Sequence, residues 1–161
     1  MSSLATPGSL TVFLLEDNEG DVLLTQEALR QTGIPYQLIT CCNGEEAVTK
    51  LQLFNCTTCP FIILLDINVP RKNGLEVLQY IRQNSILQFI PAFMLTTSTD
   101  PADIQRAYQE GATGYLNKPV DWESFTRMIQ QLLEFWQQFV IPVPHASNPV
   151  KSGNAPYNQG A

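Results

Sequence analysis

Apolar runs of strand length alternate with amphipathic segments along most of the chain. Apolar runs bounded by turn residues predict five strands, at 10–15, 36–41, 61–65, 92–95 and 114–116. Segments of helical periodicity predict five helices, at 21–31, 45–53, 75–83, 102–110 and 122–139. Such alternation is typical of βαβ units. The pattern therefore predicts an α/β fold with a doubly wound sheet of five parallel strands.

Finer features of the pattern indicate which segments are buried. The run at 61–65 is almost purely apolar, as expected of a central strand covered on both faces. Gly33 and Gly111 follow two predicted helices and suit helix C-caps, because glycine adopts the left-handed conformation at no Cβ penalty. In the last helix, a stripe at helical spacing is predicted to face the core: Phe125, Ile129, Leu132, Trp136 and Phe139. Phe135 and Val140 lie off this stripe and are candidates for a partner interface.

The chain of 161 residues suits a single domain. We expect a flexible N-terminal segment at 1–9, a folded domain at 10–140 and a flexible tail at 141–161. The tail is rich in Pro, Ser and Asn and has little apolar content to offset the entropy of ordering. The single histidine, His145, falls in this tail and is interpreted as a solvated residue.

Composition narrows the class of protein further. A net charge of −6 lacks the basic footprint of nucleic-acid binding. No apolar run approaches the roughly 20 residues that a membrane span needs, and the first ten residues resemble no secretory signal. We therefore predict a cytoplasmic protein that binds neither nucleic acid nor membrane.

The four cysteines are interpreted as structural thiols. Cys56 and Cys59 have the spacing of a redox motif or of half a zinc site. A four-ligand zinc site needs a second matching pair, which the adjacent Cys41 and Cys42 do not offer.

Polar residues that could bind a ligand or take part in a reaction lie at the ends of four of the five predicted strands. They are Glu16 and Asp17 after the first, Asp66 after the third, Thr96 and Thr97 at the end of the fourth, and Lys118 after the fifth. The carboxyl ends of parallel strands meet at one edge of an open sheet, where ligands bind. We therefore expect these side chains to converge.

Their chemistry suits phosphoryl transfer at a magnesium ion. Three converging carboxylates would repel one another unless a hard cation lay between them, and Mg²⁺ prefers oxygen ligands. A lysine ammonium can pair with a phosphate, and carboxylates can act as nucleophiles toward phosphoryl groups. Asp66 is the best candidate nucleophile because it follows the most apolar strand.

Four segments, in this order and spacing, closely resemble the receiver domain of two-component response regulators. They are Glu-Asp-Asn at 16–18, Leu-Leu-Asp-Ile-Asn-Val-Pro-Arg-Lys-Asn-Gly at 64–74, Leu-Thr-Thr-Ser at 95–98 and Gly-Ala-Thr-Gly-Tyr-Leu-Asn-Lys-Pro at 111–119. The resemblance covers residues 10–140 and implies a flavodoxin-like (βα)5 fold.

The resemblance implies the roles of the site residues. Asp66 would be the phosphoacceptor, and Asp17 and Asp66 would bind Mg²⁺ directly. Glu16 stands where many receivers carry Asp and would bind the ion through water, a role that tolerates the longer side chain. The backbone carbonyl of Asn68 would complete the protein ligands, and Lys118 would pair with the phosphoryl group.

The resemblance also implies a conformational switch. Thr96 would supply the switch hydroxyl, and Tyr115 would turn inward when Thr96 is drawn to the phosphate. Asn68 and Ser98 occupy the two positions that influence hydrolysis of the acyl phosphate, and these small polar side chains imply a phosphorylated lifetime of minutes. The bond before Pro119 would be cis, which X-Pro chemistry permits at modest cost.

Within the family, the chain looks like the single-domain regulators paired with cyanobacterial phytochromes. This implies a sensor histidine kinase of phytochrome type as phosphoryl donor, no enzymatic activity beyond self-phosphorylation and slow autodephosphorylation, and a homodimer through the fourth helix, fifth strand and fifth helix. With no output domain expected, output would be a protein contact. Its candidate surface comprises Tyr108, Trp122, Phe135 and Val140.

Other classes of protein fit less well. A phosphatase of the haloacid dehalogenase type also uses a strand-end Asp, a Thr and a Lys around magnesium, but it wants a second Asp where this chain has Asn68. A degenerate receiver that acts only as an interaction module would usually have lost an acceptor or metal residue. A flavodoxin or Rossmann enzyme would need a phosphate-binding loop that is absent after the first strand.

Overall fold

Five parallel strands form one sheet in the order β2-β1-β3-β4-β5. The computed structural model describes residues 9–54 and 60–139. The strands are β1 (Leu10–Leu15), β2 (Tyr36–Cys41), β3 (Phe61–Leu65), β4 (Ala92–Thr96) and β5 (Gly114–Asn117). The predicted fold is confirmed, with β4 and β5 each one residue longer than predicted. As predicted from its apolar sequence, β3 is central and pairs with both β1 and β4.

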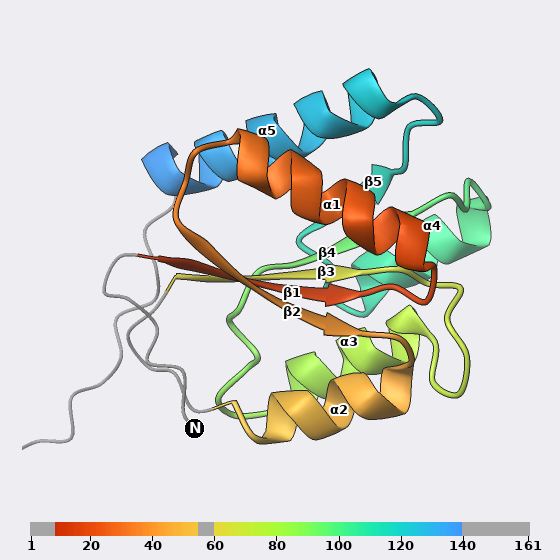
Figure 1. Cartoon of the computed structure of the whole chain (residues 1–161). Coiled ribbons are helices and arrows are strands. Elements are labelled where there is room, and N and C mark those ends of the chain that lie inside the picture. Colours follow the sequence, from red (N-terminus) through yellow and green to blue (C-terminus); the bar gives the residue numbers. More distant parts are fainter. Residues whose placement is uncertain (1–8, 55–59, 140–161) are drawn as a thin grey trace, which may run out of the picture.

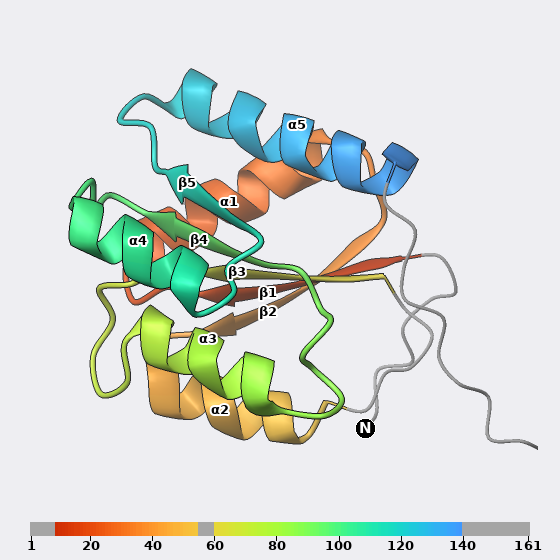
Figure 2. The same ribbon diagram turned by 180° about the vertical axis from the view of Figure 1, so that it is seen from behind.

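Helices cover both faces of this sheet (Figures 1 and 2). They are α1 (Glu19–Gln31), α2 (Gly44–Gln52), α3 (Gly74–Gln83), α4 (Pro101–Gln109) and α5 (Trp122–Phe139). Figure 1 shows α1 and α5 together above the sheet, with α2 and α3 below it. α4 packs on the same side as α3, since Ala107 belongs to the hydrophobic cluster formed by α2 and α3.

Capping side chains explain why the first four helices begin one or two residues earlier than apolar periodicity predicts. Asn18, Asn43, Asn73 and Asp100 each precede a helix and accept a hydrogen bond from a backbone N–H of its first turn. Such caps satisfy donors that have no partner within the helix. They fix the starts of the helices at the strand-end edge.

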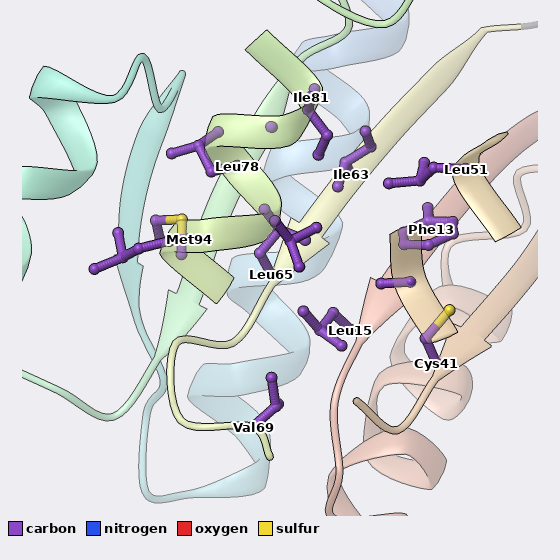
Figure 3. Packing of buried hydrophobic residues seen from close by; sticks show 14 of the residues in the cluster. Phe13, Leu15, Cys41, Leu51, Ile63, Leu65, Val69, Leu78, Ile81 and Met94 are labelled. Atoms are coloured by element: carbon purple, nitrogen blue, oxygen red, sulfur yellow. The ribbon is translucent and has the colours of Figure 1, made fainter. Parts of the chain in front are cut away.

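Alternate residues of the central strands supply two hydrophobic clusters, one on each face of the sheet. Figure 3 shows the cluster between the sheet and helices α2 and α3, where Ile63 and Leu65 of β3 lie among residues of the neighbouring elements, including Leu78 and Ile81 of α3. The intervening Ile62 and Leu64 pack against α1 and α5 on the other face. β3 is therefore buried on both sides, which positions the residue that follows it.

The stripe predicted for α5 is confirmed in part. Phe125 and Ile129 are buried, and Leu132 and Trp136 are partly buried against the same cluster. The third buried hydrophobic residue of α5 is Leu133, which the prediction missed, because the helix presents residues spaced by four to the groove beside α1. The side chain of Phe139, together with Val140, lies outside the described residues.

Several predictions concern segments that the structure leaves undescribed. These are residues 1–8, the cysteine pair at 56 and 59, and the tail with His145. Of the described cysteines, Cys41 is buried and Cys42 is exposed, and both are free thiols. Within the described ranges, no helix has the length and apolar character needed to cross a membrane.

Candidate functional site

Three carboxylates meet at the carboxyl edge of the sheet. Glu16 and Asp17 follow β1, and Asp66 follows β3. One ligand oxygen from each lies within 4.8 Å of the others. Glu16 and Asp66 are buried while Asp17 is exposed, so the cluster opens to solvent on one side. We call these three residues the acidic triad.

Backbone contacts hold the acidic triad in place. The N–H of Glu16 donates to the carbonyl of Cys41 at 2.9 Å, and the N–H of Asp66 donates to the carbonyl of Leu15 at 3.0 Å. These bonds extend the strand pairing by one residue, which aligns the two carboxylates across neighbouring strands. The carboxylate of Asp66 accepts from the N–H of Asn68 at 3.2 Å.

Lys118 joins this edge from the end of β5 and contacts three carboxylates. Its Nζ donates to Glu16, to Asp66 Oδ2 at 3.0 Å and to Asp21 Oδ2 at 3.1 Å. The Lys118 side chain is only 8% exposed. Its backbone N–H donates to the carbonyl of Thr96 at 2.8 Å, which fixes the start of the side chain.

Asp21 was not among the predicted site residues. It lies in the first turn of α1, five positions after Glu16, and this turn starts at the strand-end edge. A carboxylate in the first turn of a helix that follows a strand-end acidic pair was the available signal. This signal does not by itself indicate a site residue, because the helix dipole alone favours an acidic residue in the first turn of a helix.

The charges at this edge are mutually dependent. Burial alone would lower the pKa of Lys118, but its hydrogen bond to Glu16 and the charge of Asp66 outweigh burial and raise that pKa. Burial is the largest influence on Glu16 and raises its pKa, while Lys118 acts in the opposite direction. Lys118 therefore remains a full positive charge among the acidic triad at neutral pH.

The predicted switch residues lie on the next two strands of the sheet, Thr96 on β4 and Tyr115 on β5. Thr96 ends β4 and is fully buried, and its hydroxyl oxygen accepts from the N–H of Ser98 at 3.3 Å. The hydroxyl of Tyr115 donates to the carbonyl of the same Ser98 at 2.9 Å. The Ser98 hydroxyl in turn donates to Asp103 of α4 at 2.7 Å. The loop after β4 thus connects Thr96, Tyr115 and α4.

The prediction of a cis bond before Pro119 is wrong for this structure. All peptide bonds in the described residues are trans. Trans is the intrinsically favoured form of an X-Pro bond, and Lys118 reaches Glu16 and Asp66 with it.

The donor set fits a hard divalent cation. The acidic triad offers carboxylate oxygens only, close enough together to share one ion, and oxygen ligands from a few carboxylates are what Mg²⁺ takes. Asn68, whose backbone carbonyl was predicted as a further ligand, is exposed beside Asp66.

A parallel five-stranded sheet with an acidic triad and a lysine at its carboxyl edge defines a receiver-type α/β domain. Residues 12–130 match the sequence profile of the response regulator receiver domain. The chain belongs to this family, and it is a signalling protein of the two-component type. The resemblance predicted from its sequence motifs is confirmed.

Individual relatives match this chain over nearly their whole length. The response regulator Rcp1 of Synechocystis sp. is 35% identical over 143 residues, which cover 87% of this chain and 97% of the relative. The structure of a phosphorylated cyanobacterial phytochrome response regulator, RcpA, matches with a TM-score of 0.76 and 32% identity, over 83% of this chain and 97% of that one. The Mn²⁺-bound form of Rcp1 matches with a TM-score of 0.73 and 35% identity, over 83% and 99%.

Proposed function

We propose that Asp66 accepts a phosphoryl group from a sensor histidine kinase at a Mg²⁺ site formed by the acidic triad, and that phosphorylation alters the protein's contacts. The observation that carries this proposal is the meeting of three carboxylates and Lys118 at the end of the central strand. The similar Rcp1 structure is of an Mn²⁺-bound form and the similar RcpA structure is of a phosphorylated form, which supports a divalent ion and a phosphoryl group here.

Asp66 is the most suitable acceptor of the three carboxylates. The side chain of Glu16 is only 3% exposed, against 11% for that of Asp66, so Glu16 is less accessible to a phosphoryl donor. Asp17 is exposed, so it lacks the fixed position a nucleophile needs. Asp66 is oriented by hydrogen bonds from Lys118 and from the backbone N–H of Asn68.

The site residues then divide between binding the cation and binding the phosphoryl group. Asp17 and Asp66 would hold Mg²⁺ directly, Glu16 would do so through water, and Asn68 would contribute its backbone carbonyl. The ion supplies neutralisation of the charge on the transferring group. Lys118 pairs with the phosphoryl oxygens as a compact ammonium.

The proposed switch passes through the loop after β4. The hydroxyl of Thr96 shifts toward the phosphoryl group, and because Ser98 contacts both Thr96 and Tyr115, the shift alters the Tyr115 contact and the start of α4. This is a population shift between two arrangements of one loop. With Asn68 and Ser98 at the positions that influence hydrolysis, slow autodephosphorylation ends the signal within minutes.

The donor and output partners follow from the same reasoning. The name of one similar structure, a cyanobacterial phytochrome response regulator, supports a phytochrome-type kinase as the phosphoryl donor. The net charge of −6 disfavours nucleic acid as a partner. Output uses a homodimer face built from α4, β5 and α5, where Tyr108 and Phe135 are 53% and 58% exposed. Replacement of Phe135 by Glu should convert the dimer to a monomer, as measured by light scattering. An unchanged mass would contradict the proposed role of this surface in dimerisation.

The direct test is intact-mass measurement after incubation with Mg²⁺ and acetyl phosphate. We expect one added phosphoryl group on the wild type, none on Asp66→Asn, and none on wild type in EDTA. A folded wild type that gains no mass would indicate a degenerate interaction module. Steady turnover of p-nitrophenyl phosphate would instead support the phosphatase alternative.

A further inference from the structure

We propose that Asp21 is a positioning residue that holds the Lys118 ammonium in place when a divalent cation binds to the acidic triad. The inference rests on the proposed Mg²⁺ site and adds to it a residue outside the predicted ligands. It concerns how one lysine and one cation share the same carboxylates.

Lys118 and a cation need the same oxygens. An ammonium has three donors, and Lys118 directs them at Glu16, Asp66 and Asp21. Two of these partners, Glu16 and Asp66, belong to the acidic triad. Only Asp21 lies outside it. A cation on the triad therefore weakens two of the three attractions that hold Lys118.

Lys118 is poorly placed to do without a partner. Its side chain is 8% exposed, and an unpaired charge that is largely removed from water is unfavourable. Its backbone is held by the hydrogen bond to Thr96, so the residue as a whole does not withdraw. A second positive charge close by would add repulsion, because Coulomb interactions are strong where solvent is scarce. A retained carboxylate partner relieves both effects.

Asp21 fits this task because its own position does not depend on the triad. Its N–H donates to the side chain of Asn18 at 3.1 Å, and its carbonyl accepts from the hydroxyl of Thr25 at 2.8 Å. Its side chain is 37% exposed, in contrast to the buried side chain of Lys118. It therefore stays in reach of the lysine whichever way the triad is occupied.

Two separate grooves at this edge distinguish Asp21 from its acidic neighbour in α1. Asp21 and Lys118 line a groove of about 200 Å³ with Trp122. Glu19 lies in the same first turn but lines another groove, of about 380 Å³, with Glu16 and Asp17. Among the described residues, Glu19 forms no ion pair with Lys118. Glu19→Gln is therefore a matched control that removes one charge near the triad without touching the lysine.

Loss of Asp21 should weaken metal binding through Lys118. In Asp21→Asn, the ammonium loses the carboxylate partner that lies outside the triad, so it competes more strongly for Glu16 and Asp66. We expect affinity for the cation to fall about fivefold, which lies within the range of interaction energies between residues in direct contact. Glu19→Gln should cost less than about twofold, since an exposed charge is largely screened. Asp21→Glu should restore affinity to within about twofold of wild type, because it retains the carboxylate.

In the experiment, the full chain is titrated with Mn²⁺, and the concentration of free ion is measured from its electron paramagnetic resonance signal. Wild type, Asp21→Asn, Asp21→Glu and Glu19→Gln are each measured with Lys118 present and again in a Lys118→Met background. Circular dichroism establishes that each variant is folded. If Asp21 acts through Lys118, the difference between Asp21→Asn and Glu19→Gln disappears when the lysine is absent.

The outcomes separate this inference from the proposed function. A wild type that binds no Mn²⁺ overturns the proposed metal site, and this inference with it. Wild-type binding together with equal losses in Asp21→Asn and Glu19→Gln, or an Asp21→Asn loss that persists without Lys118, overturns the inference alone. If Lys118→Met does not fold, failure of Asp21→Glu to restore affinity overturns it, and restoration beside an unaffected Glu19→Gln supports it.

Discussion

Replacement of Gly74 by alanine should disturb both the stability of the domain and the acceptor site. Gly74 begins α3, and a Cβ atom on it would lie 2.1 Å from the carbonyl oxygen of Asp66 and 2.8 Å from its carbonyl carbon. Both atoms belong to the backbone, so no side-chain rotation can relieve the overlap. The N–H of Gly74 also donates to the carbonyl of Ile67 at 3.1 Å, which ties the start of α3 to this loop.

The cost can be estimated from the two opposing effects of the added methyl group. Overpacking against fixed atoms costs about 1 to 3 kcal/mol, and contact with backbone at 2.1 Å belongs at the upper end. The gain in helix propensity from glycine to alanine is at most about 1 kcal/mol. We therefore expect the free energy of unfolding of Gly74→Ala to fall by about 2 kcal/mol. Relief of the overlap moves the Asp66 peptide, so phosphorylation should slow as well.

Urea unfolding and the rate of mass gain with acetyl phosphate measure the two effects. Gly33→Ala is the control, because Gly33 has a φ of +69° and no heavy atom near its Cβ position. It should cost about 1 kcal/mol through left-handed backbone strain and leave phosphorylation unchanged. A Gly74→Ala protein with wild-type stability and a wild-type phosphorylation rate would refute the close approach of α3 to Asp66.

Three further predictions concern charged residues. Lys118→Met leaves the buried Glu16 without its counter-charge and should lower the free energy of unfolding by about 3 kcal/mol in EDTA; Mg²⁺ should recover part of this loss in urea titrations, and an equal loss with and without the ion would contradict the site. The Arg82 guanidinium donates to three backbone carbonyls, at 2.7 to 3.0 Å, in the connections before β4 and β5. Arg82→Gln should therefore cost about 2 kcal/mol in thermal unfolding, and Arg82→Lys should recover little because an ammonium lacks the planar fork. The hydrogen bond from Lys50, together with those from the backbone N–H and the thiol of Cys42, lowers the pKa of Glu46 from 4.5 to about 2. This interaction stabilises the fold above pH 4.5 and is lost as the pH falls toward 2. Because the pair faces solvent, it is worth about 1 kcal/mol or less. The gap in unfolding free energy between wild type and Glu46→Gln should narrow between pH 6 and about pH 3, and a constant gap would contradict the shift.

The order of elements and most of the site edge could be predicted from the sequence. Alternating apolar runs and amphipathic segments are local features, and a parallel sheet places every strand end at one edge. Glu16, Asp66 and Lys118 could therefore be assigned to a common edge before any contact was known. The roles assigned to them rested on four motifs in the spacing of the receiver family, which no single motif would have supported.

Tertiary structure alone decided which side chains touch. Asp21 reaches Lys118 because α1 starts beside the end of β5, two elements far apart in the chain. Leu133, and not Leu132, is fully buried because α5 is rotated to fit against α1. The requirement for glycine at 74 comes from the approach of α3 to the Asp66 carbonyl. Local sequence sets which residues form an element and where it ends, whereas the contacts between elements depend on how all of them pack together.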